Sequence, residues 1–205
     1  MKIIDITVPI SENTPVFPGD PHPIITSHKS HLFYENGVVV SELKLTTHSG
    51  THIDAPAHVE PNGLCMDSFP VELVEGRACV VDMSCITHFE SVASLPKEIR
   101  IQDCNLKMLI FASNSKFSVF PNMKPGLVDF LKQSGVEIIA TDLLSIDAVN
   151  DKNLHNHRLI LGSNIWIAEN LNLSDVENGF YRYIIAPMKT SAIDGAPARA
   201  ILIKD

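Results

Sequence analysis

The stretch Thr47-His48-Ser49-Gly50-Thr51-His52-Ile53-Asp54-Ala55-Pro56-Ala57-His58 is the most informative part of this 205-residue chain. Three of the nine histidines of the chain and one aspartate fall within its last eleven residues. Imidazole nitrogens and carboxylate oxygens are the ligands that Zn²⁺, Mn²⁺ and Fe²⁺ take in hydrolytic sites. His48, His52, Asp54 and His58 are therefore the candidate metal ligands and proton carriers.

The local backbone restricts how these side chains could meet. Gly50, Pro56 and the β-branched residues between them oppose a helix. In a straight strand His48 and His52 would share a face but lie about 13 Å apart, too far for one ion. We therefore expect the chain to bend near Gly50, where glycine allows unusual backbone angles. Beyond the bend, His52 and Asp54 would share one face of a strand, about 7 Å apart between their α-carbons.

Short apolar runs rich in β-branched residues predict eight strands in the rest of the chain. They are residues 3–10, 38–46, 79–83, 107–111, 137–141, 165–168, 181–187 and 200–203. A helix is predicted over Pro125–Gln133, where proline suits the first turn and Ser134-Gly135 would end the helix. Residues 69–74 and 145–149 could each form one or two helical turns.

The order of these elements predicts an α/β fold. Helix and strand alternate only around residues 107–141, which resembles one βαβ unit with a parallel pair of strands. Elsewhere strands follow strands, so we expect a mixed, strongly curved sheet with a few peripheral helices. Residues 18–32 are rich in proline, histidine and serine and read as a long loop, a type of segment that is often functional. The length suits one domain over residues 1–205.

Composition excludes several classes of function. Hydrophobic residues make up 45% of the chain and charged residues 20%, which is typical of a globular protein. The formal net charge of −8 opposes a general affinity for nucleic acid or for an anionic membrane. The N-terminal residues lack the pattern of a signal peptide, and no apolar run reaches the length of a membrane span. A cytoplasmic protein is the expectation.

The four cysteines and the remaining histidines give weaker signals. Cys65, Cys79, Cys85 and Cys104 form no CxxC pair, so we expect reduced and mostly buried thiols rather than a thiolate metal site. Isolated histidines are usually ordinary core or surface residues, and that is the expectation for the four of them at His22, His28, His31 and His88.

The histidine-rich stretch resembles the HxGTHxDxPxH signature of the cyclase-like metal hydrolases, a family that includes bacterial kynurenine formamidases and isatin hydrolases. Here the signature reads His48-x-Gly50-Thr51-His52-x-Asp54-x-Pro56-x-His58. Three more segments are similar to that family, in the same order along the chain. They are residues 4–20, the pair His157-Arg158 with Glu169 twelve residues after the histidine, and residues 194–200. The resemblance therefore covers essentially the whole chain.

The resemblance implies a swivelling β/β/α fold and a role for each site residue. His48, His52 and Asp54 would bind a first metal ion, and Asp54 would bridge to a second ion held by His157 and Glu169. His58 would be the general acid/base. From the residues alone, His155 is as good a candidate as His157, and Glu169 reads as an ordinary acidic residue; the resemblance decides both.

The implied activity is metal-dependent hydrolysis of a small amide, with two Zn²⁺ per subunit and Mn²⁺ as the alternative. A metal-activated hydroxide would attack the carbonyl, and His58 would protonate the departing nitrogen, since imidazole exchanges protons near neutral pH. The leading substrate is an aryl formamide such as N-formylkynurenine, which would give kynurenine and formate. A homodimer or homotetramer is also implied, with residues 18–32 as a segment that could reach a neighbouring subunit.

Two alternatives stay open. Bacterial kynurenine formamidases generally carry a substrate-binding tryptophan where this chain has Phe17, which keeps an aromatic face but lacks the indole N–H. A cyclic amide, as in isatin hydrolase, is therefore the rival substrate, and Phe17 could equally be a core residue. The alternative of another class is a non-catalytic zinc-stabilised protein, although structural zinc sites usually have four closed Cys/His ligands.

Overall fold

A computed structural model describes residues 1–30, 38–86, 89, 95, 105–114, 116–191 and 193–204 of the chain. Eight strands form one mixed sheet in the order β1-β10-β4-β8-β7-β6-β5-β9. Their bounds are β1 Lys2–Asp5, β4 His52–Asp54, β5 Glu75–Asp82, β6 Leu106–Ala112, β7 Ile138–Thr141, β8 Trp166–Glu169, β9 Gly179–Pro187 and β10 Gly195–Lys204. Because β9 also pairs with β10, the sheet closes into a barrel-like ring.

Strands β5, β6, β7 and β8 are mutually parallel, and the other pairings of the sheet are antiparallel. Helix α2 (Pro125–Gln133) connects β6 to β7, and helix α3 (His155–Gly162) connects β7 to β8. The predicted mixed, curved sheet is confirmed, and so is the parallel unit around residues 107–141. The sequence predicted one such unit, whereas the structure has a second one, in which α3 connects the parallel strands β7 and β8.

The parallel strands are buried on both faces, as sheets of this kind require. Along β6, Met108 and Ile110 join one hydrophobic cluster, while Leu109 and Phe111 join the other. The first cluster collects residues from strands all round the ring. The second lies under the helices and contains Leu127, Val128 and Leu131 of α2 and Ile160 and Leu161 of α3. Neither helix approaches the length and apolarity that a bilayer crossing demands.

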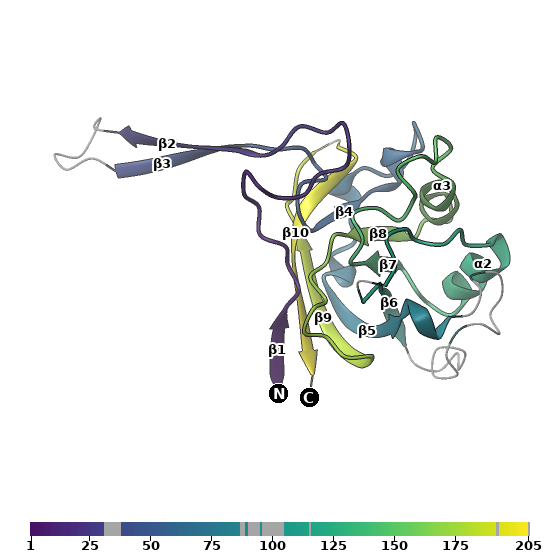
Figure 1. The fold of residues 1–205 in the computed structure, drawn as a ribbon. Helices are drawn as coiled ribbons and strands as arrows, with labels where there is room; N and C mark the ends of the chain where they lie inside the picture. The colour runs from purple at the N-terminus through teal and green to yellow at the C-terminus, as the bar shows by residue number, and fades with distance from the viewer. Residues whose placement is uncertain are drawn as a thin grey trace.

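Two further strands, β2 (Ile24–Ser30) and β3 (Val38–Lys44), pair with each other and with no other strand of the described residues. They form a hairpin, called the arm below, that extends away from the rest of the molecule (Figure 1). The prediction of a loop over residues 18–32 was therefore wrong from Ile24 onward. The apolar residues of β2 and β3 are exposed, so this segment shows no buried face of the kind that the sequence pattern detects.

The remaining predictions can be compared element by element. All eight predicted strands overlap an observed strand, although β1 ends at Asp5 and continues only as an isolated bridge at Thr7. Helix α2 has the predicted bounds. Residues 69–74 contain one 3₁₀ turn, η3 (Val71–Leu73). Residues 145–149 form bends and the start of a turn, so the helical prediction there was wrong. Further 3₁₀ turns are η1 Pro56–His58, η2 Met66–Ser68 and η4 Met83–Cys85.

Candidate metal centre

The expected bend before β4 is present. Gly50 has a φ of +66°, and a Cβ at this position would lie 3.0 Å from the side chain of Ile10 and 3.2 Å from the carbonyl oxygen of Val8. Both the backbone angle and the space therefore require glycine. Beyond the bend, β4 runs between β10 and β8, and all three of its residues are buried. His52 and Asp54 consequently share one face of the strand.

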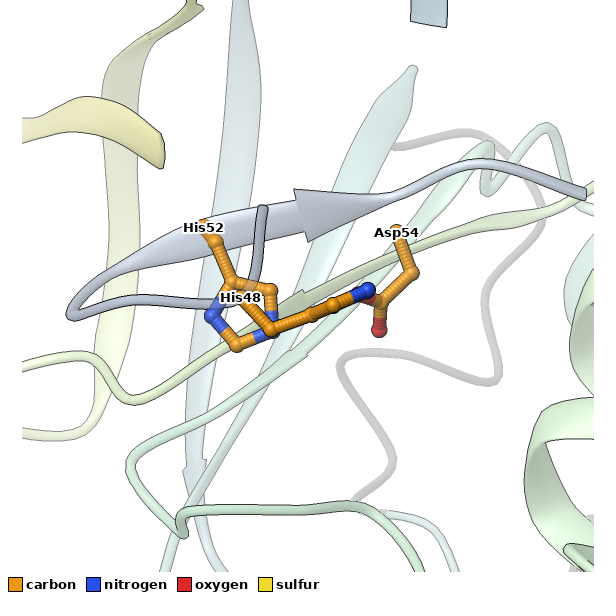
Figure 2. Close-up of side chains that lie close together, drawn as sticks. All are labelled: His48, His52 and Asp54. Carbon is orange, nitrogen blue, oxygen red and sulfur yellow. The ribbon is translucent and has the colours of Figure 1, made fainter. Parts of the chain in front are cut away.

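The side chains of His48, His52 and Asp54 converge beside β4 (Figure 2). His48 comes from the loop before the bend, and its Nδ1 lies 2.7 Å from Asp54 Oδ1. The Nε2 of His52 lies 3.3 Å from the same oxygen. The bend therefore brings these three side chains together, as binding of a shared ion would require.

His157 and Glu169 form a second set with Asp54. His157 lies in the first turn of α3, and its Nε2 is 3.6 Å from Asp54 Oδ2 and 3.4 Å from Glu169 Oε1. Glu169 ends β8 and stands opposite His52 in the strand register, with Glu169 Oε2 3.5 Å from His52 Nε2. Asp54 thus belongs to both sets, and the structure brings together all five residues that the resemblance named as ligands.

Hydrogen bonds at the far side of two rings fix their orientation. His52 Nδ1 donates to the carbonyl oxygen of Gly50 at 2.8 Å. His157 Nδ1 donates to Asp147 Oδ2, also at 2.8 Å. Each bond leaves Nε2 facing the buried carboxylates, in the orientation that metal-binding histidines commonly show. Sequence reasoning missed Asp147, which precedes His157 by ten residues and carries no motif.

The donor set fits divalent cations. Asp54 is fully buried, and its Oδ2 has no hydrogen-bond partner among the residues that the structure describes. Within the first set, Nε2 of His52 lies 3.3 Å from Oδ1 of Asp54, and within the second set, Nε2 of His157 lies 3.4 Å from Oε1 of Glu169. Ligands about 2.0–2.1 Å from a tetrahedral zinc ion are separated by about 3.3–3.4 Å. These two spacings therefore match those expected around an ion, whereas Nδ1 of His48 and Oδ1 of Asp54 lie at hydrogen-bond distance, 2.7 Å.

The electrostatics of the two sets are those of strongly paired ions. Burial has the largest single effect on the pKa of His52 and would lower it, but the charges and hydrogen bonds of Asp54 and Glu169 together outweigh burial and raise the pKa to about 10. Burial also opposes the charged form of His157, and Glu169 and Asp147 raise its pKa to about 12. Despite its burial, the pKa of Asp54 is held well below the usual value by the surrounding imidazoles. A bound cation would take the place of these protons.

His58 and Phe17 line the cavity that opens onto the two sets. The cavity has a volume of about 210 Å³, and its apolar wall includes Leu144 and Leu154. His58 lies in η1, with its ring centroid 4.3 Å from that of His48 and 5.4 Å from that of His157. Phe17 also lines a neighbouring cavity of about 290 Å³. Phe17 is thus half-buried beside the site, and its role as a substrate contact stays a prediction.

The other sequence candidates lie elsewhere. His155, the rival of His157, points its Nε2 at the carbonyl oxygen of Met123, 3.0 Å away. His22 is exposed, and His28 pairs with Glu42 on the arm. Cys65 and Cys79 take part in neither set. The remaining predictions concern residues outside the described part of the chain: His31, His88, Cys104 and the side chain of Cys85.

Asp194 is a polar neighbour of the cluster that sequence reasoning did not assign. Its carboxylate lies 3.0 Å from His48 and 3.2 Å from His58, although it follows them by 146 and 136 residues. The signal that could have found it is the similarity of residues 194–200 to the ending typical of the resembled family. That similarity was not carried over to a role for Asp194.

Comparisons with known proteins agree with this geometry. The family model named Cyclase matches residues 4–148. The kynurenine formamidase of Bacillus cereus is 32% identical over 205 aligned residues, which cover 97% of this chain and 96% of that protein. A solved structure described as a potential metal-dependent hydrolase with cyclase activity is 26% identical, with a TM-score of 0.72 over 98% of this chain and 96% of that one.

Isatin hydrolase A from Labrenzia aggregata superposes with a TM-score of 0.76 over 100% of this chain and 94% of that one. At 19% identity, this likeness concerns the fold alone. The matched family model covers most of the chain, and the relative from Bacillus cereus matches nearly its full length. The chain therefore belongs to the cyclase family.

Proposed function

We propose that this chain is a metal-dependent amide hydrolase, and that its substrate is an aryl formamide such as N-formylkynurenine. The observation that carries the proposal is the pair of His/carboxylate sets that share Asp54 and open into a cavity with His58 and Phe17. The similarity to kynurenine formamidase of Bacillus cereus over nearly the whole chain supports the choice of substrate.

The five ligands would hold two divalent cations, His48, His52 and Asp54 one ion and Asp54, His157 and Glu169 the other. When bound, such ions acidify a water molecule and polarise the carbonyl oxygen of the amide. We propose zinc as the native metal, with manganese as the alternative, because His and carboxylate ligands suit both.

The chain's own residues would then complete the reaction. Phe17 and the apolar wall at Leu144 and Leu154 would hold the aromatic part of the substrate. His58 belongs to neither proposed ligand set, but its ring lies beside the ring of His48 in one set and that of His157 in the other. As the carbon–nitrogen bond breaks, His58 would give a proton to the aryl amine nitrogen. The water oxygen remains on the carbonyl carbon and leaves as formate.

The direct test is a substrate panel on metal-loaded protein. N-formylkynurenine should be converted to kynurenine with release of one formate per turnover, and the rate should fall on chelation and return with added zinc. Formate measured enzymatically and kynurenine measured by absorbance give independent readouts. Conversion without formate release would refute formamide cleavage.

Hydrolysis of a cyclic amide is the second candidate, and the presence of Phe17 in place of tryptophan favours it. Isatin belongs on the same panel, because ring opening adds water without releasing a fragment. A product heavier than the substrate by one water would identify this reaction. Metal that cannot be removed without unfolding the protein, with no turnover of any amide, would instead point to a structural zinc site.

We also propose that residues 1–205 act as one catalytic domain in a homodimer or homotetramer. The arm supports an oligomer, because an isolated two-stranded hairpin is marginally stable in water and this one exposes Ile24, Val39 and Leu43. Light scattering on the purified protein tests this directly. A cytoplasmic location stays a prediction.

A further inference from the structure

Asp194 lies directly before β10, and its side chain contacts two histidines with different proposed roles. Its Oδ2 lies 3.0 Å from Nε2 of His48 and 3.2 Å from Nδ1 of His58. Its Oδ1 accepts a hydrogen bond from the hydroxyl of Thr47 at 3.0 Å. One carboxylate oxygen therefore joins a proposed metal ligand to the proposed proton carrier.

The chemistry of a carboxylate decides which ring nitrogens carry protons. An ionised carboxylate only accepts hydrogen bonds, so the nitrogens that face it must donate. His48 faces a carboxylate at each nitrogen, Asp54 at Nδ1 and Asp194 at Nε2, so both nitrogens donate when no metal is bound. A metal ion at Nδ1 would replace the proton there, and the proton on Nε2 would still be donated to Asp194. A proton on Nδ1 of His58, in turn, leaves Nε2 as the atom that can accept a proton and pass it on.

The main chain holds Asp194 in this place. Its carbonyl oxygen accepts a hydrogen bond from the N–H of Ala55 at 2.8 Å. The next residue, Gly195, is paired with Asp54 in the register of β10 and β4. A Cβ at Gly195 would lie 3.0 Å from Cε1 of His48 and 2.9 Å from the carbonyl oxygen of Ile53. The approach of residues 194–195 to the cluster therefore depends on glycine at the second position.

The other two rings of the cluster use separate acceptors. His52 donates to the carbonyl oxygen of Gly50, and His157 donates to Asp147. Among the hydrogen bonds between described residues, Asp194 supplies the contact that orients His58. Loss of this carboxylate should therefore affect the proton carrier in a way that loss of Asp147 would not.

We propose that Asp194 is a positioning residue that holds His58 with its proton on Nδ1 and its Nε2 free, while orienting His48 through the same oxygen. The proposal rests on the proposed function for the role of His58 in turnover, but not for the orientation of its ring. Mutation of a residue that orients a site histidine in this way typically lowers activity or metal affinity ten- to a hundredfold.

Kinetics of the metal-saturated protein test the role in turnover. D194A should lower kcat about ten- to a hundredfold with little change in KM and with both metals retained. D194N keeps an acceptor oxygen in nearly the same shape, so it should recover part of the lost kcat. D194N also keeps the test available if D194A does not fold. Loss of a metal ion from D194A at saturating zinc would make Asp194 a ligand and overturn the proposal.

A double-mutant comparison shows through which residue Asp194 acts. In the background of H58A, adding D194A should cost much less than it costs in the wild-type protein, because the group that it positions is already absent. An equal loss in both backgrounds would overturn the proposal.

Nuclear magnetic resonance gives a readout that does not depend on substrate. In zinc-loaded protein with ¹⁵N-labelled histidine, His58 should be the Nδ1–H tautomer, and D194A should shift it toward the Nε2–H tautomer. D194N should keep the wild-type tautomer in part. D147N is the matched control, because Asp147 contacts His157 and should leave His58 unchanged. An unchanged tautomer of His58 in D194A would overturn the proposal, even for a protein that hydrolyses no formamide.

Discussion

Strands β4 and β3 invert the usual distribution of polar and apolar residues in opposite ways. The three residues of β4 are all buried, although two of them are His52 and Asp54. The seven residues of β3 are all exposed, although Val38, Val39, Val40 and Leu43 are among them. β4 lies within the ring, whereas β3 lies in the arm that leaves it (Figure 1).

Each of these two inverted distributions is unfavourable unless a further interaction stabilises it. Buried carboxylates and imidazoles are stabilised by pairing or by a bound cation. A long exposed strand with apolar side chains is stabilised when another surface covers it. The comparison therefore separates a region that we propose metal ions complete from a region that we propose another subunit covers. The predictions below test each half.

The largest effect is expected from D54A. Because Asp54 contributes to both ligand sets, its loss should reduce the metal content from two ions to nearly none and abolish turnover. Metal analysis after gel filtration measures this. D175A, which removes an exposed carboxylate outside both sets, should keep both ions. A fully loaded D54A protein would contradict the bridging role.

H58A should separate chemistry from metal binding. His58 is in neither proposed ligand set, so both ions should remain while kcat falls by about 10²–10⁴-fold, the usual cost of losing a general acid/base. Metal analysis and formate release on one preparation provide the two readouts. If metal and activity disappear together, His58 is a ligand.

Removing the metal should make the stability of the protein depend on pH. The pKa values of His48, His52 and His157 are raised from 6.5 to about 9, 10 and 12. Below pH 6.5 these imidazoles are protonated in both states, so their stabilisation is complete. As pH rises above 6.5, the unfolded chain loses these protons before the folded protein does, and the free energy of unfolding falls.

The chelated protein should therefore melt several degrees lower at pH 9 than at pH 7. The zinc-loaded protein should lack this particular loss, because its metal-bound rings carry no extra proton to release. Thermal unfolding followed by circular dichroism at both pH values measures the difference. A melting temperature of the chelated protein that does not fall over this range would show that the ion pairs contribute little.

The smallest effect on turnover is expected in the arm. Val39 and Leu43 are four residues apart in β3, so their side chains lie on the same face of the strand. Val39 is 68% exposed and Leu43 is 60% exposed. V39K with L43K should weaken the oligomer, seen as a lower mass by light scattering, while both metal ions remain bound. V71K, at an exposed valine of η3, should leave the mass unchanged. An oligomer that tolerates charges in the arm would have its interface elsewhere.

The sequence predicted those elements whose ends are determined by residues at or beside the ends themselves. Helix α2 begins at Pro125 and ends before Ser134 as expected, and the positive φ of Gly50 produces the bend that the spacing of the histidines required. In these cases the residue that determines the backbone conformation belongs to the element itself, so the element can be predicted from a single sequence.

The elements that were missed depend on partners far along the chain or on exposure. Helix α3 opens with His155-Asn156-His157, a poor helix-forming start, and Asp147 accepts hydrogen bonds from the N–H groups of Asn156 and His157. In β2, residues 24–28 are all exposed, so this part of the strand lacks the alternation of buried and exposed residues that marks a strand. The contact of Asp194 with His48 joins residues 146 positions apart, a relation that spacing cannot reveal.

Glu169 also has a contact outside the ligand sets. The backbone N–H of Ile146 donates to its Oε1 at 2.6 Å, the same oxygen that faces His157. Ile146 directly follows Leu144 and Ser145, which line the cavity. The main-chain amide next to these two lining residues thus donates to the carboxylate proposed to receive the second ion. Hydrogen–deuterium exchange at this single amide would report ion loading from the backbone itself, in solution and before any substrate is added.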